Sequence, residues 1–321
     1  MSADAQAARL SRPPPRDEEE ADAAWEFLSE MEAVVPWPRL LALIELYYPK
    51  AGPKGGRPPM PLETMLRVYF LQQWYALSDP MAEEMLYDSD AMRRFAGIEL
   101  GDDRIPDETT ILNFRHLLEK HRLTEQLFAG VNSHLADQGI TLRSGTLVDA
   151  TIIDAPSSTK NEARARDPEM SSTKKGNEWY FGMKAHVGVD ADSGVVHRLE
   201  TTTAKVHDSQ VWDELLHGRE TSVWADKGYV SATREAAFSG LGKFWGVMRK
   251  VPKGGALHPV DEDINRLIAK VRARVEHPFR VIKRQFGYLK TRYRGLVKNR
   301  AQLFTLFALG NLFLVRRKLM E

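Results

Sequence analysis

The sequence contains no cysteine. This absence excludes disulfide bonds, zinc sites built on thiolates, and catalysis by a thiol nucleophile. Long hydrophobic runs are also missing, since the longest, residues 303–315, is too short to span a bilayer and contains Gly310 and Asn311. The first 20 residues lack the apolar segment of a secretory signal. These absences predict a soluble protein of the cytoplasm.

Charge of one sign is scarce in two parts of the chain, although the net charge is only +1. Residues 1–35 carry nine acids and three bases, whereas residues 241–300 carry sixteen bases and four acids. A block of such strong positive charge is typical of proteins that bind a polyanion, most often nucleic acid.

Changes in composition divide the 321 residues into segments. Residues 1–24 are rich in acids and proline, which predicts a flexible acidic leader. Helical periodicity then predicts an all-helical domain for DNA binding or dimerisation over 25–138. Strand patterns predict an α/β catalytic domain over 139–300, followed by a C-terminal helix over 301–321.

The helical segment predicts four or five short helices between Leu62 and Gln138, one of them capped by Asp107. One interpretation is a helix-turn-helix whose Asn113, Arg115 and Lys120 face outward. The other is an ordinary helical domain with a solvated face.

The second half alternates between β-rich and helical patterns. Strands are predicted at 141–155, 180–190, 195–204, 221–226 and 243–250, with helices at 209–218, between the last two strands, and from Asp261 onward. This order fits a mixed sheet flanked by helices, and the ribonuclease H-like fold is a member of that class.

Three acids lie where catalytic carboxylates are expected. Asp149 interrupts an apolar strand, and a carboxylate buried there needs a cation as its partner. Asp226 ends another strand, and Glu276 follows on the late helix. Three oxygen donors suit a hard ion such as Mg²⁺, and two such ions about 4 Å apart can clamp an in-line phosphoryl displacement.

The 25 residues from Arg272 onward contain eight Lys or Arg residues and one carboxylate, Glu276. On a regular helix Arg272, Glu276, Arg280 and Lys283 would share one face, with the acid on the metal and the bases on phosphates. Pro278 implies either a kink or a helix that starts near Glu276.

Each acid also has a structural interpretation. Asp149 would be a buried acid paired with an arginine or lysine. Asp226 would cap a helix that begins at Lys227. Glu276 would pair with a neighbouring arginine. Spacing alone does not choose between these interpretations and the metal site.

Four stretches carry a resemblance to a known family: "GTLVDATIIDAPSSTKN", "GNEWYFGMKAHVGVD", "ADKGY" and "RARVEHPFRVIKRQFGYLKTRYRGL". They resemble bacterial insertion-sequence transposases of the IS-five family, which have a catalytic Asp, Asp, Glu set on a ribonuclease H-like fold. The resemblance covers residues 45–315 and implies that Asp149, Asp226 and Glu276 are the three catalytic, metal-binding acids.

The chain departs from this family at two places. The signature around the third acid has Tyr, Arg, Glu and Lys; Arg272, Glu276 and Lys283 match it, but Ala269 stands at the Tyr position. The 50 residues from Asp226 to Glu276 are also too few for the β-rich insertion of some relatives.

The resemblance implies a DNA transposase that binds the terminal inverted repeats of its element, cleaves the ends and joins 3′-hydroxyls to target DNA. It further implies two Mg²⁺ ions, with Mn²⁺ as a substitute, a homodimer on double-stranded DNA, and association with the nucleoid. The residues expected on DNA are Arg272, Arg280, Lys283, Arg284, Lys290, Arg292, Arg294, Lys160 and Asn161. The alternatives are a catalytically silent DNA-binding descendant and a metal-dependent nuclease that only hydrolyses DNA.

Several other polar and aromatic residues are not expected to be catalytic. Asp154 lies an odd number of residues after Asp149, so it faces the other side of the strand and is not expected in catalysis. The histidines at 186, 197 and 207 lack metal-ligand spacing and are expected to be structural or to face DNA. Trp179 and Tyr180 either stack on a base or pack in the core.

Overall fold

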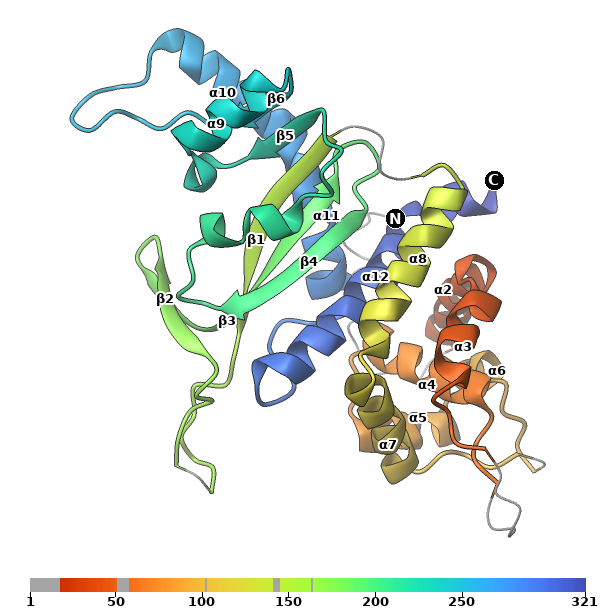
Figure 1. The fold of residues 1–321 in the computed structure, drawn as a ribbon. Helices are drawn as coiled ribbons and strands as arrows, with labels where there is room; N and C mark the ends of the chain where they lie inside the picture. The colour runs from red at the N-terminus through yellow and green to blue at the C-terminus, as the bar shows by residue number, and fades with distance from the viewer. Residues whose placement is uncertain (1–17, 51–57, 102, 141–144, 163) are drawn as a thin grey trace. The chain divides into compact units, whose positions relative to one another are not determined.

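The structure is a computed structural model that describes residues 18–50, 58–101, 103–140, 145–162 and 164–321. The chain forms two compact units (Figure 1). The first unit contains the chain up to His134 together with Val281–Tyr288 and Phe304–Glu321. The second contains Leu135–Arg280 and Leu289–Leu303. The boundary therefore lies close to the predicted one at 138, but the end of the chain belongs with the N-terminal helices.

The first unit is built from helices (Figure 1). They are α2 (Glu18–Val34), α3 (Trp37–Glu45), α4 (Leu62–Trp74), α5 (Asp79–Asp88), α6 (Asp90–Ala96), α7 (Glu108–Lys120), most of α8 (Leu123–Asp137) and the later part of α12 (Leu296–Met320). The predicted group of short helices after Leu62 is confirmed by α4 to α8. The prediction of a flexible leader over residues 1–24 is wrong for residues 18–24, which are helical. Residues 1–17 lie outside the residues that the structure describes.

Local sequence explains where these helices begin and end. Pro36 separates α2 from α3, because its ring cannot continue a helix. The Ser78 side chain accepts a hydrogen bond from the Met81 N–H at the start of α5. The Asp107 carboxylate accepts one from the Thr110 N–H at 2.7 Å, which confirms the predicted cap of α7.

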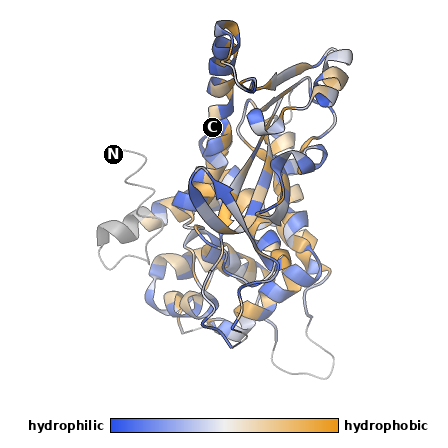
Figure 2. Cartoon of the chain, turned by 90° about the vertical axis from the view of Figure 1, so that its left-hand side faces the viewer, coloured by the Kyte–Doolittle hydropathy of each residue, from blue (hydrophilic) through white to orange (hydrophobic). Residues whose placement is uncertain are grey.

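The core of the first unit forms around α4 and α12. Residues Thr64 to Trp74 of α4 are buried except Arg67, so this helix has almost no solvated face. In α12 the buried side chains include Leu306, Phe307, Leu309 and Leu312. The Tyr69 hydroxyl meets the Thr305 hydroxyl at 3.1 Å inside this core. Hydrophobic and hydrophilic segments alternate along most of the helices (Figure 2).

The prediction that Arg115 faces outward on a helix-turn-helix is wrong. Its guanidinium is buried and pairs with Asp79 at 2.8 Å and Glu119 at 3.2 Å. Asn113 and Lys120 are exposed as predicted. A charged residue on a helix is expected outside, but two carboxylate partners allow this one to lie inside.

Arg115→Ala is therefore expected to destabilise the protein by about 3 kcal/mol, because it leaves two carboxylates without their cation. Urea unfolding measures this loss. Lys120→Ala on the same helix should change the free energy of unfolding by less than about 0.5 kcal/mol. Equal effects of the two substitutions would contradict the buried ion-pair assignment.

The second unit contains a mixed sheet, six-stranded in the part of the chain that the structure describes. Its strands are β1 (Gly145–Asp154), β2 (Ser171–Lys175), β3 (Glu178–Asp190), β4 (Val196–Thr203), β5 (Ser222–Ala225) and β6 (Phe244–Val247). The main order is β2-β3-β1-β5-β6, with β4 also paired to β3. β1 runs antiparallel to β3 and parallel to β5, and β6 is parallel to β5. This arrangement confirms the predicted α/β, ribonuclease H-like sheet.

Two features of the second unit differ from the prediction: one polar strand and one segment of tight turns. β2 was missed, because "SSTKK" has no hydrophobic alternation. The helix predicted at 209–218 is wrong: two short 3₁₀ helices, Asp208–Val211 and Asp213–Leu215, stand there. Their tight turns place Trp212 and Leu215 in a core cluster with residues of β1, β5 and β6.

The last part of the second unit is helical but irregular. α9 (Ala232–Gly240) and α10 (Pro259–Arg272) are followed by a 3₁₀ turn at Ala273–Val275 and by α11 (Glu276–Arg280). The π-helical segment Val281–Gln285 then belongs to the first unit. None of the helices in the described ranges has both the length and the apolar character that crossing a membrane requires.

Candidate active site

Two of the three predicted acids lie side by side on neighbouring parallel strands. Val148 of β1 pairs with Ala225 of β5. The residues that follow this pair are Asp149 and Asp226. The pKa of Asp149 is raised to about 6, chiefly by burial; Arg272 opposes the shift, and the charge of Asp226 makes a smaller contribution to it.

Arg272 supplies the cation that a buried Asp149 needs. Its Nη2 lies 3.2 Å from Asp149 Oδ2, at the end of α10. Its Nε is buried without a hydrogen-bond partner. The structural interpretation of Asp149, a buried acid paired with an arginine, is therefore observed, and Arg272 contacts a carboxylate at the position where it was predicted to hold phosphate.

Asp226 directly follows β5 and caps the next turn. Its Oδ1 accepts a hydrogen bond from the Gly228 N–H at 2.7 Å, at the start of the 3₁₀ helix Lys227–Tyr229. A Cβ atom at position 228 would lie 2.8 Å from the same oxygen, so glycine leaves room for the carboxylate. The cap uses Oδ1, and Oδ2 takes no part in it.

Glu276 is not brought into contact with the two aspartates. It is exposed and is the first residue of α11, four residues after Arg272. Pro278 is thus the third residue of a helix, where its missing N–H costs little, and the alternative of a helix start is the one observed. Among the described residues, no group of three or more His, Asp or Glu side chains is arranged to hold a metal ion.

A third acid that the sequence reasoning missed lies near the aspartate pair. The charge of Asp208 contributes to the raised pKa of Asp149. Its Oδ1 accepts a hydrogen bond from Lys184 Nζ at 2.8 Å and lies 3.8 Å from His186 Nδ1. Burial lowers the pKa of His186 to about 4, so the imidazole is neutral at pH 7. The available signal was Lys184 and His186 on one face of the alternating strand β3.

Tyr229 is a further residue that the sequence did not single out. Its side chain is buried, and its hydroxyl has no hydrogen-bond partner. Burial raises its pKa well above the ordinary value, and the charges of Asp208, Asp149 and Asp226 add to that shift. The "ADKGY" stretch therefore places a neutral hydroxyl beside the acids.

The donor chemistry fits a hard divalent cation. The aspartate pair offers carboxylate oxygens, and Mg²⁺ in proteins is commonly held by one or two carboxylates together with water and substrate phosphate. Burial disfavours the charged form of Asp149, and Arg272 offsets this effect only in part, so a second cation would favour the ionised carboxylate. Asp149 and Asp226 are the residues that would hold the ion.

Some of the predicted DNA-binding residues gather at the far end of β1. Asn161, Arg292 and Arg294 line a hollow of about 230 Å³. The Thr291 N–H donates to the Asp154 carbonyl at 2.8 Å, which fixes this segment to the strand. The Asn161 side chain bonds the backbone of Ala165 in its own loop, so it shapes the loop instead of projecting from it.

The other predicted DNA-binding residues do not form one helix face. Arg280 is exposed at the end of α11, whereas Lys283 and Arg284 lie in the π-helical segment of the other unit. The 3₁₀ turn at Ala273–Val275 also changes the spacing. The prediction of a regular shared face is therefore wrong. Lys290 and Lys160 are exposed on the second unit.

The exposure of the remaining histidine and aromatic side chains decides between their predicted roles. The side chains of His186 and His197 are buried, and His207 caps the 3₁₀ helix that begins at Asp208. Trp179 is 71% exposed, which contradicts core packing and leaves its surface open to stacking. The Tyr180 hydroxyl donates to Glu178 at 2.6 Å.

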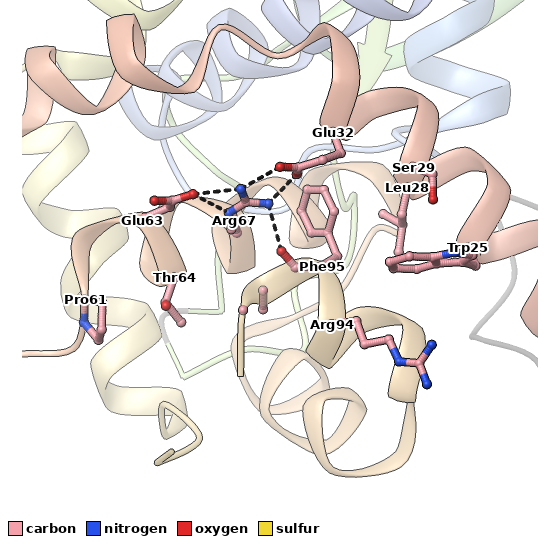
Figure 3. A pocket seen from close by; sticks show the side chains of 12 residues that line it. Trp25, Leu28, Ser29, Glu32, Pro61, Glu63, Thr64, Arg67, Arg94 and Phe95 are labelled. Carbon is pink, nitrogen blue, oxygen red and sulfur yellow. Dashed lines mark hydrogen bonds and ion pairs between the residues drawn. The ribbon is translucent and has the colours of Figure 1, made fainter. Parts of the chain in front are cut away.

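The first unit contains a hollow of about 620 Å³ (Figure 3). The arginine on its wall is not available to bind an anionic ligand. Arg67 lies on its wall, and its guanidinium is held by Glu32, by Glu63 at 2.7 Å and by the Phe95 carbonyl at 3.0 Å. Because these oxygens already surround it, Arg67 is a structural cation that joins α2, α4 and α6.

The aspartate pair lies in a region that matches a family model. Residues 140–312 match the model described as "Transposase DDE domain". This chain belongs to the DDE transposases. Residues 15–117 match a second model, described as a transposase domain. Members of the DDE family are DNA-cleaving and DNA-joining enzymes of mobile elements, and they generally use divalent metal ions. Membership of the IS-five group stays a prediction.

A solved structure with similarity to the transposase is described as a cryo-EM structure of the piggyBac transposase synaptic complex with hairpin DNA. The sequences are 11% identical, and the match covers 93% of this chain and 75% of that chain with a TM-score of 0.41.

The raised pKa of Asp149 predicts a specific pH dependence of stability when no divalent metal is added. An acid with a pKa of about 6 when folded and 3.8 when exposed stabilises the fold at low pH, and this contribution is lost as pH rises through 6. Between pH 4 and pH 7 the wild type should lose about 2 kcal/mol relative to Asp149→Asn.

Urea unfolding at several pH values measures this difference, with Asp213→Asn, an exposed acid, as the matched control. Parallel pH profiles for the wild type and Asp149→Asn would show that the carboxylate is not perturbed.

Proposed function

We propose that this transposase cuts and joins the ends of its own insertion sequence, with Asp149, Asp226 and Glu276 as its catalytic acids. The observation that carries the proposal is the pairing of Val148 with Ala225, which sets two aspartates side by side. The parallel β1–β5 pairing fixes their separation through the backbone, so the pair does not depend on flexible side chains for its formation.

The aspartates would hold the divalent ions, Mg²⁺ in our proposal, and two ions bound together activate the attacking oxygen and stabilise the leaving oxygen of a phosphodiester. Asp226 keeps its orientation through the Gly228 N–H. Arg272 balances the charge of Asp149 before a cation arrives. A divalent ion held by Asp149 would supply this charge balance in its place, and the Arg272 guanidinium would then be available to a DNA phosphate, the role predicted for it.

Glu276 completes the set in this proposal. It is exposed four residues after Arg272 and begins a short helix bounded by a 3₁₀ turn and a π-helical segment. Such irregular segments often occur at functional sites, because they can change their hydrogen bonding locally. In this proposal a rearrangement of the 3₁₀ turn between α10, which ends at Arg272, and α11, which begins at Glu276, would bring Glu276 toward the aspartates.

Double-stranded DNA is the proposed partner, as terminal inverted repeats and as target. The excess of Lys and Arg after residue 241 supplies the attraction to phosphate. Arg292 and Arg294, which line the hollow at the far end of β1, would contact DNA phosphates away from the scissile bond. The N-terminal helices would recognise the repeats, and two copies would hold the two ends.

The catalytic assignment is tested with Mg²⁺ and a DNA that carries the element's own ends. Wild-type protein should cleave at the repeat tips and give joined products. Glu276→Gln and Asp226→Asn should lower both rates by roughly a hundredfold or more, because each acid acts on the developing charge. The control is Glu262→Gln, an exposed acid on α10.

Three other results would contradict the proposal. Binding without cleavage by the wild type would indicate a DNA-binding protein without catalysis. Cleavage without joined products, with a competent target present, would indicate a nuclease. Equal activity of Glu276→Gln and Glu262→Gln would remove Glu276 from the catalytic set.

The phosphate-binding role of the late basic segment gives a separate prediction. Arg294 is exposed on the second unit. If it contacts one phosphate, Arg294→Ala should weaken DNA binding equally for all sequences and reduce the slope of log K against log salt by about 0.9. Titrations at several salt concentrations measure the slope, with the exposed Lys174→Ala in β2 as the control. An unchanged slope would place Arg294 away from DNA.

A further inference from the structure

Helix α10 has an apolar stripe that its own unit covers only in part, since Ile264 and Val271 are half-buried and the other two residues are exposed. The inward side of the helix carries Ile268, which is buried, and Asn265, whose amide binds the Arg249 backbone. The stripe lies beside this inward side and consists of Val260, Ile264, Leu267 and Val271. Val260 is 58% exposed and Leu267 is 62% exposed.

The stripe has the spacing of a helix–helix interface. Its residues are separated by four, three and four positions, the repeat that two packed helices use for their contact seam. α10 contacts β5 within the second unit, and its 14 residues are long enough to present all four positions. A stripe with this period fits another helix better than it fits a small molecule or an extended peptide.

The charges that flank the stripe show which helix it fits. In this repeat Asp263 and Lys270 occupy equivalent flanking positions before Ile264 and Val271. When two copies of α10 pack antiparallel about a twofold axis, these flanking positions face each other, so Asp263 of each copy meets Lys270 of the other. A parallel arrangement gives Asp263 no basic partner, because the opposite flank carries Ile268, which is buried.

We propose that α10 is a dimerisation surface, and that its partner is the α10 helix of a second copy of this chain, packed antiparallel. The inference rests on the proposed function only in expecting two copies to meet on DNA. Asp263 already pairs with Arg266 at 2.8 Å on the same helix, but both side chains are exposed, and such a pair contributes little stability.

The contact is small, so the dimer should be weak in the absence of DNA. A seam of four apolar residues on each helix is at the low end of specific interfaces. We expect a reversible monomer–dimer equilibrium at micromolar protein concentrations, and a shared DNA complex would raise the effective concentration of the second copy.

Sedimentation velocity of the full chain without DNA, from 1 to 100 μM (about the range expected for such an interface), tests the stripe. Val260→Glu should weaken association by roughly tenfold or more, since it places a charge in the seam. Val297→Glu is the matched control, because Val297 is 71% exposed on a different helix, α12. Association that is absent in the wild type, or equally weakened by both variants, would overturn the proposal.

A charge exchange tests the antiparallel register. Asp263→Lys alone and Lys270→Asp alone should each weaken self-association by roughly tenfold, because like charges then face each other. A mixture of the two single variants should associate at least as well as the wild type, since each then meets its complement. The double variant should also regain wild-type association.

Rescue by mixing separates a lost contact from a lost fold, because two misfolded chains would not restore each other. Failure of both the mixture and the double variant to regain association would overturn the register and with it the proposal. None of these variants alters Asp149, Asp226 or Glu276, and the measurement uses no DNA. Its outcome is therefore independent of the cleavage and joining assay.

Discussion

The second unit depends on one constraint, a largely buried carboxylate, Asp149, whose nearest cation is Arg272. Asp149 and Asp226 are set side by side by a backbone pairing that neither side chain can change. Burial raises the pKa of Asp149 to about 6, and the charge of Asp226 makes a smaller contribution in the same direction. Arg272 opposes this shift from the end of α10, so the same ion pair also fixes that helix to the sheet.

This arrangement links charge balance to the conformation of the late helix. In the proposed mechanism, a cation on the aspartates would compete with the guanidinium of Arg272 for the same negative charge. The residues after Arg272 form a 3₁₀ turn, a five-residue α-helix and a π-helical segment, none of which has the stability of a long regular helix. The ion pair of Arg272 is therefore followed directly by the least regular helical segments of this part of the chain.

Sequence reasoning succeeded where a residue's environment is set by its nearest neighbours. The apolar strands around Asp149 and before Asp226 predicted the sheet and the nearness of the pair. It failed for Arg115, because periodicity predicts a polar residue outside and does not reveal two distant acids that allow it inside. Sequence reasoning also failed to predict the position of Glu276, since the irregular turns on both sides of it depend on packing and not on residue spacing.

The division of α12 between the two units has a consequence for how the protein is made. Its first turns belong to the second unit, whereas Phe304–Glu321 complete the core of the first. The ribosome synthesises α2 to α7 long before the helix segment that buries their apolar sides. The first unit therefore cannot finish folding as it emerges, and closing its core requires contacts between distant parts of the chain, which form slowly. Chaperone demand during translation should fall on the N-terminal helices, even though the catalytic residues lie elsewhere.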